Sequence, residues 1–178
     1  MKKIIFLAVM LPSLLTAFSQ NDFAIIPEPV KLTRNDGKFV LPSAISIDAD
    51  QDPGLKQAIA DLTSRLTIPT GYHVVLSNSH SATISMHLNK NPMSELGSEG
   101  YQLHVTSKNV IITANAPAGI FYGVQSFLQL LPAEITSDSL IKNITWTAPC
   151  VAVTDYPRFG WRGLMLDVSR HFFTKVEV

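Results

Sequence analysis

The chain has 178 residues, of which 46% are hydrophobic, so it is long enough to bury one core but short for an elaborate multidomain enzyme. Lysine and arginine total 14 and aspartate and glutamate total 14, with neither sign gathered in a block, so nothing favours nucleic acid or a charged membrane surface as a partner. The single cysteine, Cys150, excludes an internal disulfide and a multi-cysteine metal site, and is most simply a small buried residue.

The N-terminus has the three parts of a secretory signal peptide. Two lysines form a basic start, an apolar stretch runs from Ile4 to Phe18, and Ala17-Phe18-Ser19 is a small-x-small cleavage site. A retained membrane anchor is the alternative, but Pro12 breaks the apolar run, which falls short of the roughly 20 residues that span a bilayer. We therefore predict that residues 1–19 are a signal peptide, that no integral membrane segment follows, and that the mature chain is periplasmic or extracellular.

Prolines and alternating apolar residues mark the extended segments of the mature chain. Pro27 and Pro29 forbid a helix between Ile25 and Val30. The alternation then predicts strands or extended segments at Phe39–Leu41, Ala44–Ile47, Tyr72–Leu76, Thr83–Leu88, Tyr101–Thr106 and Val110–Ala114. A turn at Lys108-Asn109 is expected to join the last two as a hairpin.

Two segments have the apolar spacing of an amphipathic helix. The first stripe, with spacings of four, three and four residues, consists of Leu55, Ile59, Leu62 and Leu66. The second consists of Phe121, Val124, Leu128 and Leu131. Asp52 is a cap for the first helix and Pro69 ends it, whereas the second is expected between Pro117 and Pro132.

The order of these elements, β-α-β-β-β-β-α, predicts an α+β domain with helices packed on one face of a sheet. We assign residues 20–154 to this domain, with a polar loop at Ala133–Asn143 and another extended segment at Ile144–Val153. Beyond it, Gly163–Val168 is almost wholly apolar, which is typical of a strand buried on both faces in a parallel sheet or barrel. Such a strand has no partner within residues 155–178, so the sequence looks cut.

The residues after this domain carry the most specific motif. Tyr156-Pro157-Arg158-Phe159-Gly160-Trp161-Arg162-Gly163, followed by Leu166-Asp167-Val168-Ser169-Arg170-His171-Phe172, resembles the segment that opens the catalytic (β/α)₈ barrel of family 20 β-N-acetylhexosaminidases. Three upstream motifs resemble the noncatalytic N-terminal domain of that family: Ile26–Pro29, Glu99–Tyr101 and Ala118–Pro132. The resemblance implies that residues 155–178 begin a TIM barrel that is incomplete in this chain.

The activity implied by the resemblance is hydrolysis of terminal nonreducing N-acetyl-D-hexosamine residues from β-N-acetylhexosaminides, with retention and without a cofactor. Most glycosidases use two carboxylates, whereas in family 20 the 2-acetamido oxygen of the substrate attacks the anomeric carbon. In the family an adjacent Asp-Glu pair assists: the aspartate orients the acetamido group, and the glutamate is general acid and then base. The implied partner is a glycan or glycoconjugate with terminal β-linked N-acetylhexosamine.

None of the 14 acidic residues belongs to an adjacent Asp-Glu pair, so the catalytic pair is expected beyond residue 178 and this chain alone is expected to be inactive. Arg170 is the one substrate-binding residue that the resemblance assigns here, because the family has an arginine at this place that hydrogen-bonds sugar hydroxyls. It follows the predicted barrel strand, at the end where barrel active sites lie, and its planar guanidinium suits paired hydroxyls. The alternative is a loop arginine in a surface ion pair.

Three neighbours of Arg170 have weaker claims. Asp167 is assigned a supporting role, as a buried carboxylate paired with Arg162 or Arg170, although it could also touch the site. His171 could carry a proton, but a packing role behind the site is the simpler reading. Trp161 could be a sugar platform, yet it precedes the predicted strand, which favours packing in the core or at a domain interface.

A metal site is not predicted. His73, His80 and His87 recur every seven residues, but they fall on two predicted strands and a turn, and the sequence has no His-Glu-x-x-His motif. Asn143-Ile144-Thr145 matches the N-glycosylation acceptor pattern, which is expected to be unused in a bacterial-style secreted protein.

Two other functions remain open at this stage. A stand-alone secreted carbohydrate-binding module without catalysis would need only residues 20 to about 150, but it predicts an exposed aromatic row, and most tyrosines and phenylalanines lie instead on apolar periodic faces. A zincin-type protease is a more distant alternative, because its metal motif is missing.

Overall fold

The structure is a computed structural model, which describes residues 25–79, 81–167 and 174. The predicted signal peptide, residues 1–19, and the candidate residues Arg170 and His171 lie outside the described residues.

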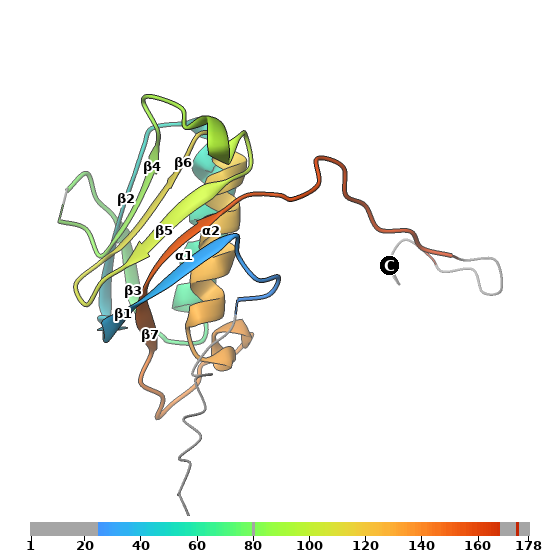
Figure 1. The fold of residues 1–178 in the computed structure, drawn as a ribbon. Helices are drawn as coiled ribbons and strands as arrows, with labels where there is room; N and C mark the ends of the chain where they lie inside the picture. The colour runs from blue at the N-terminus through green and yellow to red at the C-terminus, as the bar shows by residue number, and fades with distance from the viewer. Residues whose placement is uncertain (1–24, 80, 168–173, 175–178) are drawn as a thin grey trace, which may run out of the picture.

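Seven strands form one mixed sheet in the order β1-β7-β5-β6-β4-β2-β3 (Figure 1). Their bounds are Lys31–Val40 (β1), Ala44–Ala49 (β2), His73–Leu76 (β3), Ile84–Leu88 (β4), Tyr101–Val105 (β5), Val110–Ala114 (β6) and Thr147–Asp155 (β7). Strand β2 pairs in parallel with β3 and β4, and β4 pairs in parallel with β6, whereas the β5–β6, β5–β7 and β1–β7 pairs are antiparallel. The predicted hairpin of β5 and β6 is confirmed.

Both α-helices cover the same face of this sheet, as the α+β prediction required (Figure 1). Helix α1 spans Lys56–Thr67 and follows a short 3₁₀ turn, η1, at Pro53–Leu55. Helix α2 spans Pro117–Leu130, and two further 3₁₀ turns lie at Ser94–Leu96 (η2) and Ala133–Thr136 (η3).

Local chemistry explains the turn that leads into α1 and the residues that follow the helix. The Asp52 carboxylate accepts a hydrogen bond of 2.7 Å from the Gly54 N–H, so the predicted cap acts on η1, whereas the N-cap of α1 itself is Leu55, without a side-chain cap. After the helix, Gly71 has a φ of +69°, a left-handed conformation that glycine adopts without a Cβ clash. Leu62 and Leu66 are fully buried, as their spacing predicted.

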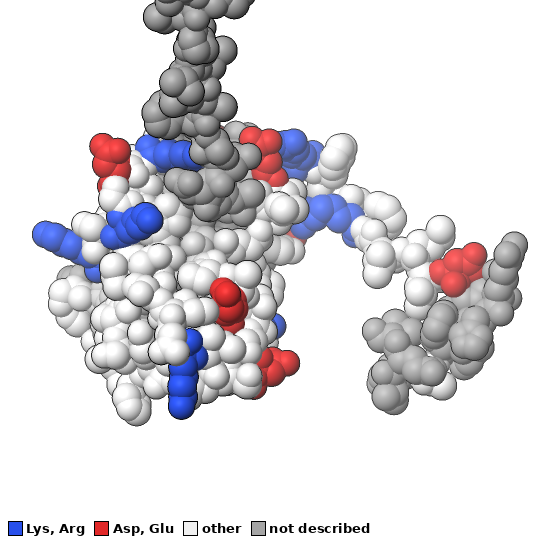
Figure 2. Space-filling view, turned by 90° about the horizontal axis from the view of Figure 1, so that it is seen from below, with Lys and Arg blue, Asp and Glu red and all other residues white. Residues whose placement is uncertain are grey.

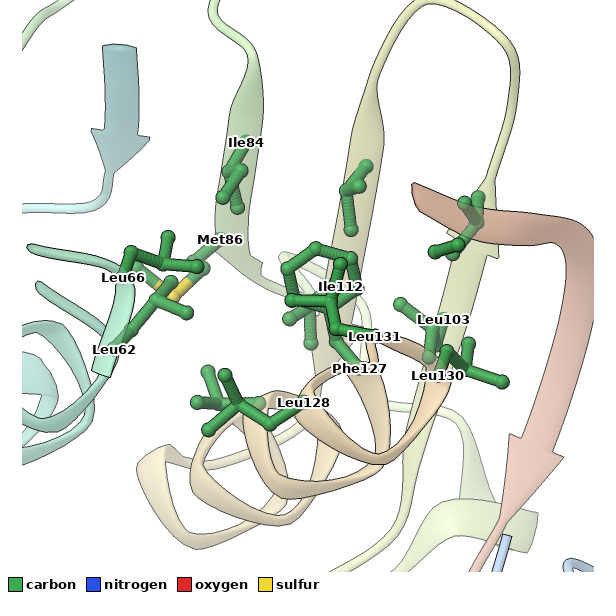
Figure 3. Packing of buried hydrophobic residues seen from close by; sticks show 14 of the residues in the cluster. Leu62, Leu66, Ile84, Met86, Leu103, Ile112, Phe127, Leu128, Leu130 and Leu131 are labelled. Atoms are coloured by element: carbon green, nitrogen blue, oxygen red, sulfur yellow. The ribbon is translucent and has the colours of Figure 1, made fainter. Parts of the chain in front are cut away.

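The core lies between the helices and the sheet. Figure 3 shows Leu62 and Leu66 of α1 beside Met86 of β4, and Phe127 of α2 over Ile112 of β6. All five are fully buried. At about 25 cal/mol per Å² of apolar surface, such burial is the main stabilising term of a domain of this size. The single cysteine, 4% exposed on β7, is buried as predicted.

The surface carries charges of both signs without a large one-signed patch on the face shown in Figure 2. No helix in the described part of the chain is long and apolar enough to cross a membrane.

Two differences from the sequence prediction concern strands. Strand β1 begins at Lys31 rather than near Phe39, because it is an edge strand held by backbone pairing with β7, and its mostly exposed residues give no apolar alternation. Conversely, residues 163–167, the described part of the segment predicted as a buried strand, form no strand, because no other strand lies beside them in the described structure.

The prediction for Trp161 also differs from the structure. Packing in a core or at a domain interface was expected, but this side chain is 87% exposed in the described part of the chain.

Candidate functional site

The motifs quoted from the sequence meet at one groove at the exit of the domain. This junction groove, as we name it, is lined by residues from four segments: 25–28, 99–101, 122–129 and 155–162. The first three segments belong to the upstream motifs, and the last includes the beginning of the barrel-opening motif. Figure 1 shows the chain leaving the domain here after β7 and running outward as an extended segment. We call residues 156–167 the exit segment.

The N-terminal wall of the groove is tied to α2 and to the exit segment through backbone groups. The Ile26 N–H donates to Gln129 Oε1 at 2.8 Å, and Gln129 Nε2 donates to the Ile26 carbonyl at 3.2 Å. The Val30 N–H donates to Asp155 Oδ1 at 3.1 Å, and Arg158 donates to the Glu28 carbonyl at 3.4 Å. The Pro-Glu-Pro motif therefore gives its backbone to the groove.

Tyr101 forms the floor of the groove. Its hydroxyl lies 2.5 Å from the Ser126 hydroxyl of α2, and both side chains are buried. Burial raises the pKa of Tyr101 to about 12, and the nearby Asp155 carboxylate adds to the rise while the Ser126 bond opposes it. The phenol is therefore neutral at physiological pH and serves as a packed hydrogen-bonding group rather than as a proton carrier.

Two glycines of the motifs, next to residues that line the groove, allow a close backbone approach. A Cβ on Gly119 would lie 2.2 Å from the Gly100 carbonyl oxygen, and a Cβ on Gly100 would lie 2.4 Å from the Leu96 carbonyl oxygen. Both distances are far below a van der Waals contact. A larger residue at Gly119 would push the first turn of α2 away from the loop that carries Glu99, and a larger residue at Gly100 would distort that loop against its own Leu96 backbone.

Arg162 closes the groove on the exit side. Its Nη2 lies 3.0 Å from Glu99 Oε1, and its Nη1 donates to the Phe159 carbonyl at 2.8 Å. The hydrogen bond to Glu99, followed by the influence of the Tyr122 side chain, raises the pKa of Arg162. The first residue of the Glu99–Tyr101 motif is thus in direct contact with the barrel-opening motif.

The predicted site residues stand as follows. Arg170 and His171 are outside the described residues, and Asp167 is exposed rather than buried because no strand covers its segment; it does have an interaction partner. Arg162, one of the two arginines predicted to pair with Asp167, forms an ion pair with Glu99 in the structure. The sequence analysis did not predict a role in this groove for three of its residues, Gln129, Tyr122 and Asp155. The first two lie inside the helix motif Ala118–Pro132.

His87 and two aspartates lie close together away from the junction groove. His87 Nδ1 lies 3.0 Å from Asp50 Oδ1, and its Nε2 lies 3.8 Å from Asp48 Oδ2. Among the residues that the structure describes, no group of three or more His, Cys, Asp or Glu could hold a metal ion. His80, the middle residue of the seven-residue repeat, is outside the described residues.

Comparison with known proteins identifies the domain. The sequence model of glycosyl hydrolase family 20, domain 2, matches residues 22–156. A β-hexosaminidase of Porphyromonas gingivalis is 32% identical over 86% of the chain, and a β-N-acetylhexosaminidase of Cellulomonas fimi is 35% identical over 86%. The chain spans only 20% and 30% of the lengths of these two relatives.

Solved structures agree in fold. The N-acetyl-β-hexosaminidase of Streptomyces plicatus, in complex with Thio-NAglucal, aligns with a TM-score of 0.75 and 33% identity over 84% of this chain and 29% of its own. The β-N-acetylhexosaminidase of Bacteroides fragilis aligns with a TM-score of 0.66 and 27% identity over 85% of this chain and 28% of its own. Since the family match covers most of the chain and includes the junction groove up to Tyr156, the chain belongs to glycosyl hydrolase family 20.

Proposed function

We propose that the whole protein that carries this chain is a β-N-acetylhexosaminidase. The observation that carries the proposal is the match of residues 22–156 to a domain of family 20, with relatives that are β-hexosaminidases. The substrate class is a glycan or glycoconjugate with a terminal, nonreducing, β-linked N-acetylhexosamine. Thio-NAglucal in the Streptomyces plicatus enzyme, and GlcNAc as product in its variants, are consistent with this class.

The exit segment supports a catalytic barrel that begins within residues 155–178. Four large apolar side chains stand in a row with little cover: Phe159 is 74% exposed, Trp161 87%, Leu164 97% and Met165 90%. Several exposed large apolar side chains within seven residues cost free energy in water and normally mark an interface or a core. In our proposal, Leu164 and Met165 lie in the first barrel strand, and the α+β domain buttresses the barrel.

The proposed reaction proceeds with retention and with participation of the substrate. The 2-acetamido oxygen attacks the anomeric carbon while the glycosidic oxygen takes a proton from a glutamic acid, and water then opens the cyclic intermediate. The assisting Asp-Glu pair is expected beyond residue 178, so this chain alone is expected to be inactive. Arg170 is proposed to hydrogen-bond hydroxyls of the terminal sugar.

Export is part of the same proposal, because residues 1–19 have the three parts of a secretory signal peptide. We propose that residues 1–19 are removed as a signal peptide and that the protein acts in the periplasm or outside the cell.

The test is hydrolysis of a chromogenic β-N-acetylglucosaminide by the whole protein, by its Arg170→Ala variant and by the 178-residue chain. Loss of a charged hydrogen-bond donor to the sugar is expected to lower kcat/KM by about 10- to 100-fold. Arg65→Ala is the matched control, since Arg65 lies on α1 outside the junction groove and has only a 3.9 Å contact to Asp61. Equal activity of the two variants would remove Arg170 from the site, and an inactive, folded whole protein would favour a carbohydrate-binding role.

A further inference from the structure

We propose that Glu99 and Arg162 form a latch that sets the direction in which the chain leaves the α+β domain. In the whole enzyme, the latch would position the segment that carries Arg170, which follows Arg162 by eight residues. The positioning role rests on the proposed function; the latch itself does not.

The latch joins two separate parts of the chain at one guanidinium, the loop before β5 and the exit segment. Nη2 of Arg162 lies 3.0 Å from Glu99 Oε1 in that loop. Nη1 donates to the Phe159 carbonyl at 2.8 Å, which closes a local turn in the exit segment. A planar fork with several fixed donors defines an orientation better than a single point charge would.

The domain side of the latch is held rigidly. Asn115 donates to the carbonyls of Met93 and Gly97 at 2.7 and 2.9 Å and accepts from the Met93 N–H at 2.9 Å, so it fixes the loop that precedes Glu99. The Gly100 N–H then donates to the Leu96 carbonyl at 2.7 Å. Since the anchor is ordered in advance, forming the latch costs the conformational entropy of the exit segment alone.

The exit segment needs such a contact. Gly160 and Gly163 lie on either side of the Trp161-Arg162 pair, and a Cβ on Gly160 would meet nothing within 4 Å. Glycines allow many backbone directions, and the aromatic side chains of Phe159 and Trp161 remain 74% and 87% exposed, so their packing on the domain contributes little. Beyond the hydrogen bond from Arg158 to the Glu28 carbonyl, the Arg162–Glu99 pair is therefore the contact that restricts the direction of the chain at this place.

The strength of the latch is limited by solvent. The side chains of Arg162 and Glu99 are 42% and 34% exposed, so salt screens their attraction. An ion pair with this exposure is expected to change a local opening equilibrium by about two- to fivefold, and the change should shrink at high ionic strength.

Trypsin cleavage of the 178-residue chain tests the latch without any activity assay. Trypsin must take the Arg162 guanidinium into its own pocket, so cleavage after Arg162 requires the latch to open. Glu99→Ala is expected to speed cleavage after Arg162 by about two- to fivefold relative to cleavage after Arg158 in the same molecule. Glu95→Ala, which removes a carboxylate from the same loop, is the matched control and should leave the ratio unchanged. An unchanged ratio in Glu99→Ala would overturn the latch.

Kinetics of the whole enzyme then test the positioning role. We expect Glu99→Ala and Arg162→Ala to lower kcat with little change in KM, and the exchange of the two residues, Glu99→Arg with Arg162→Glu, to restore part of the loss. Faster trypsin cleavage with an unchanged kcat would overturn the positioning role. Faster cleavage in a whole protein that hydrolyses no β-N-acetylhexosaminide would leave the latch standing and overturn the proposed function.

Discussion

The side-chain amide of Gln129 pairs with both backbone polar groups of Ile26, at 2.8 Å from its N–H and 3.2 Å from its carbonyl. The amide acts on the N-terminal segment as a neighbouring strand would, although 103 residues separate the two in the chain. The pair joins the Pro-Glu-Pro motif to the helix motif and so forms one wall of the junction groove.

Replacing Gln129 by alanine is expected to lower the free energy of unfolding by about 1 kcal/mol, because two hydrogen bonds at an exposed site are lost to water. Gln102→Ala is the control: Gln102 lies on β5 between Tyr101 and Leu103, so it points to the sheet face without helices. Urea unfolding gives the free energies, and amide exchange at Ile26 reports the local effect. Equal protection of the Ile26 amide in both variants would show that the pair does not hold the segment.

Gly119→Ala tests the close approach of α2 to the Gly100 loop. The added Cβ would lie 2.2 Å from the Gly100 carbonyl oxygen and 2.7 Å from the Ala114 Cβ, both rigid neighbours. We expect a loss of about 2–3 kcal/mol, as for other overpacked core positions. Gly160→Ala, where the Cβ meets nothing within 4 Å, should stay within about 0.5 kcal/mol of the original chain in the same urea titration. Similar losses in both variants would mean that the approach is looser than described.

Tyr101→Phe removes the hydroxyl that meets Ser126 and leaves a buried serine without this partner, at an expected cost of about 1–2 kcal/mol near pH 7. The folded pKa of Tyr101 is raised to about 12, so its neutral form stabilises the fold fully below the unfolded pKa of 10.0 and progressively less as pH rises toward 12. The stability difference between the original chain and Tyr101→Phe should therefore narrow between pH 9 and about pH 11. Ultraviolet titration of the phenols provides a second check. A difference that is constant over this range would contradict the raised pKa.

Asp50 gives a prediction on the acidic side. Burial alone would raise its pKa, but the hydrogen bond from the Leu88 N–H, followed by contacts with His87 and Lys90, outweighs burial and lowers the pKa below its usual value of 3.8. A lowered folded pKa means stability that is present above pH 3.8 and lost as pH falls through the folded pKa. Asp50→Asn should be less stable than the original chain at pH 7 and should approach it below pH 3.8.

The matched control for Asp50→Asn is Asp36→Asn, on the exposed part of β1. Urea unfolding of both variants at pH 7, pH 5 and about pH 3 provides the comparison. A gap between Asp50→Asn and the original chain that persists unchanged at the lowest pH would contradict the assignment.

The sequence predicts the local elements of this fold well. Both helices follow from apolar spacing, the η1 turn before α1 follows from its Asp52 cap, and the β5–β6 hairpin follows from alternation around a short turn. The start of strand β1 is not predicted, because the sequence of this exposed edge strand, KLTRNDGKFV, contains little apolar alternation. The order of the strands in the sheet is not predicted either, since parallel pairs such as β4–β6 join segments with no local signal between them.

The sequence predicts only part of the junction groove. Its tyrosines lie inside the motifs that carry the family resemblance, but the contacts between motifs span 63 residues for Arg162–Glu99 and 103 for Ile26–Gln129. Periodicity and capping rules act over a few residues, so they do not predict such pairs. Glu99 was the available signal, because a charged side chain that belongs to a motif but has no packing role indicates a partner elsewhere in the chain.

The central claim is that the whole protein hydrolyses β-N-acetylhexosaminides with help from the 2-acetamido group. The most direct measurement compares its hydrolysis of a chromogenic N-acetyl-β-glucosaminide with that of the matching β-glucoside, which lacks the acetamido group. We predict that the first is cleaved and that the second is cleaved more slowly by a factor of about 1,000 or more, because the internal nucleophile is missing. Comparable rates on both substrates, or none on either with a folded protein, would contradict the account.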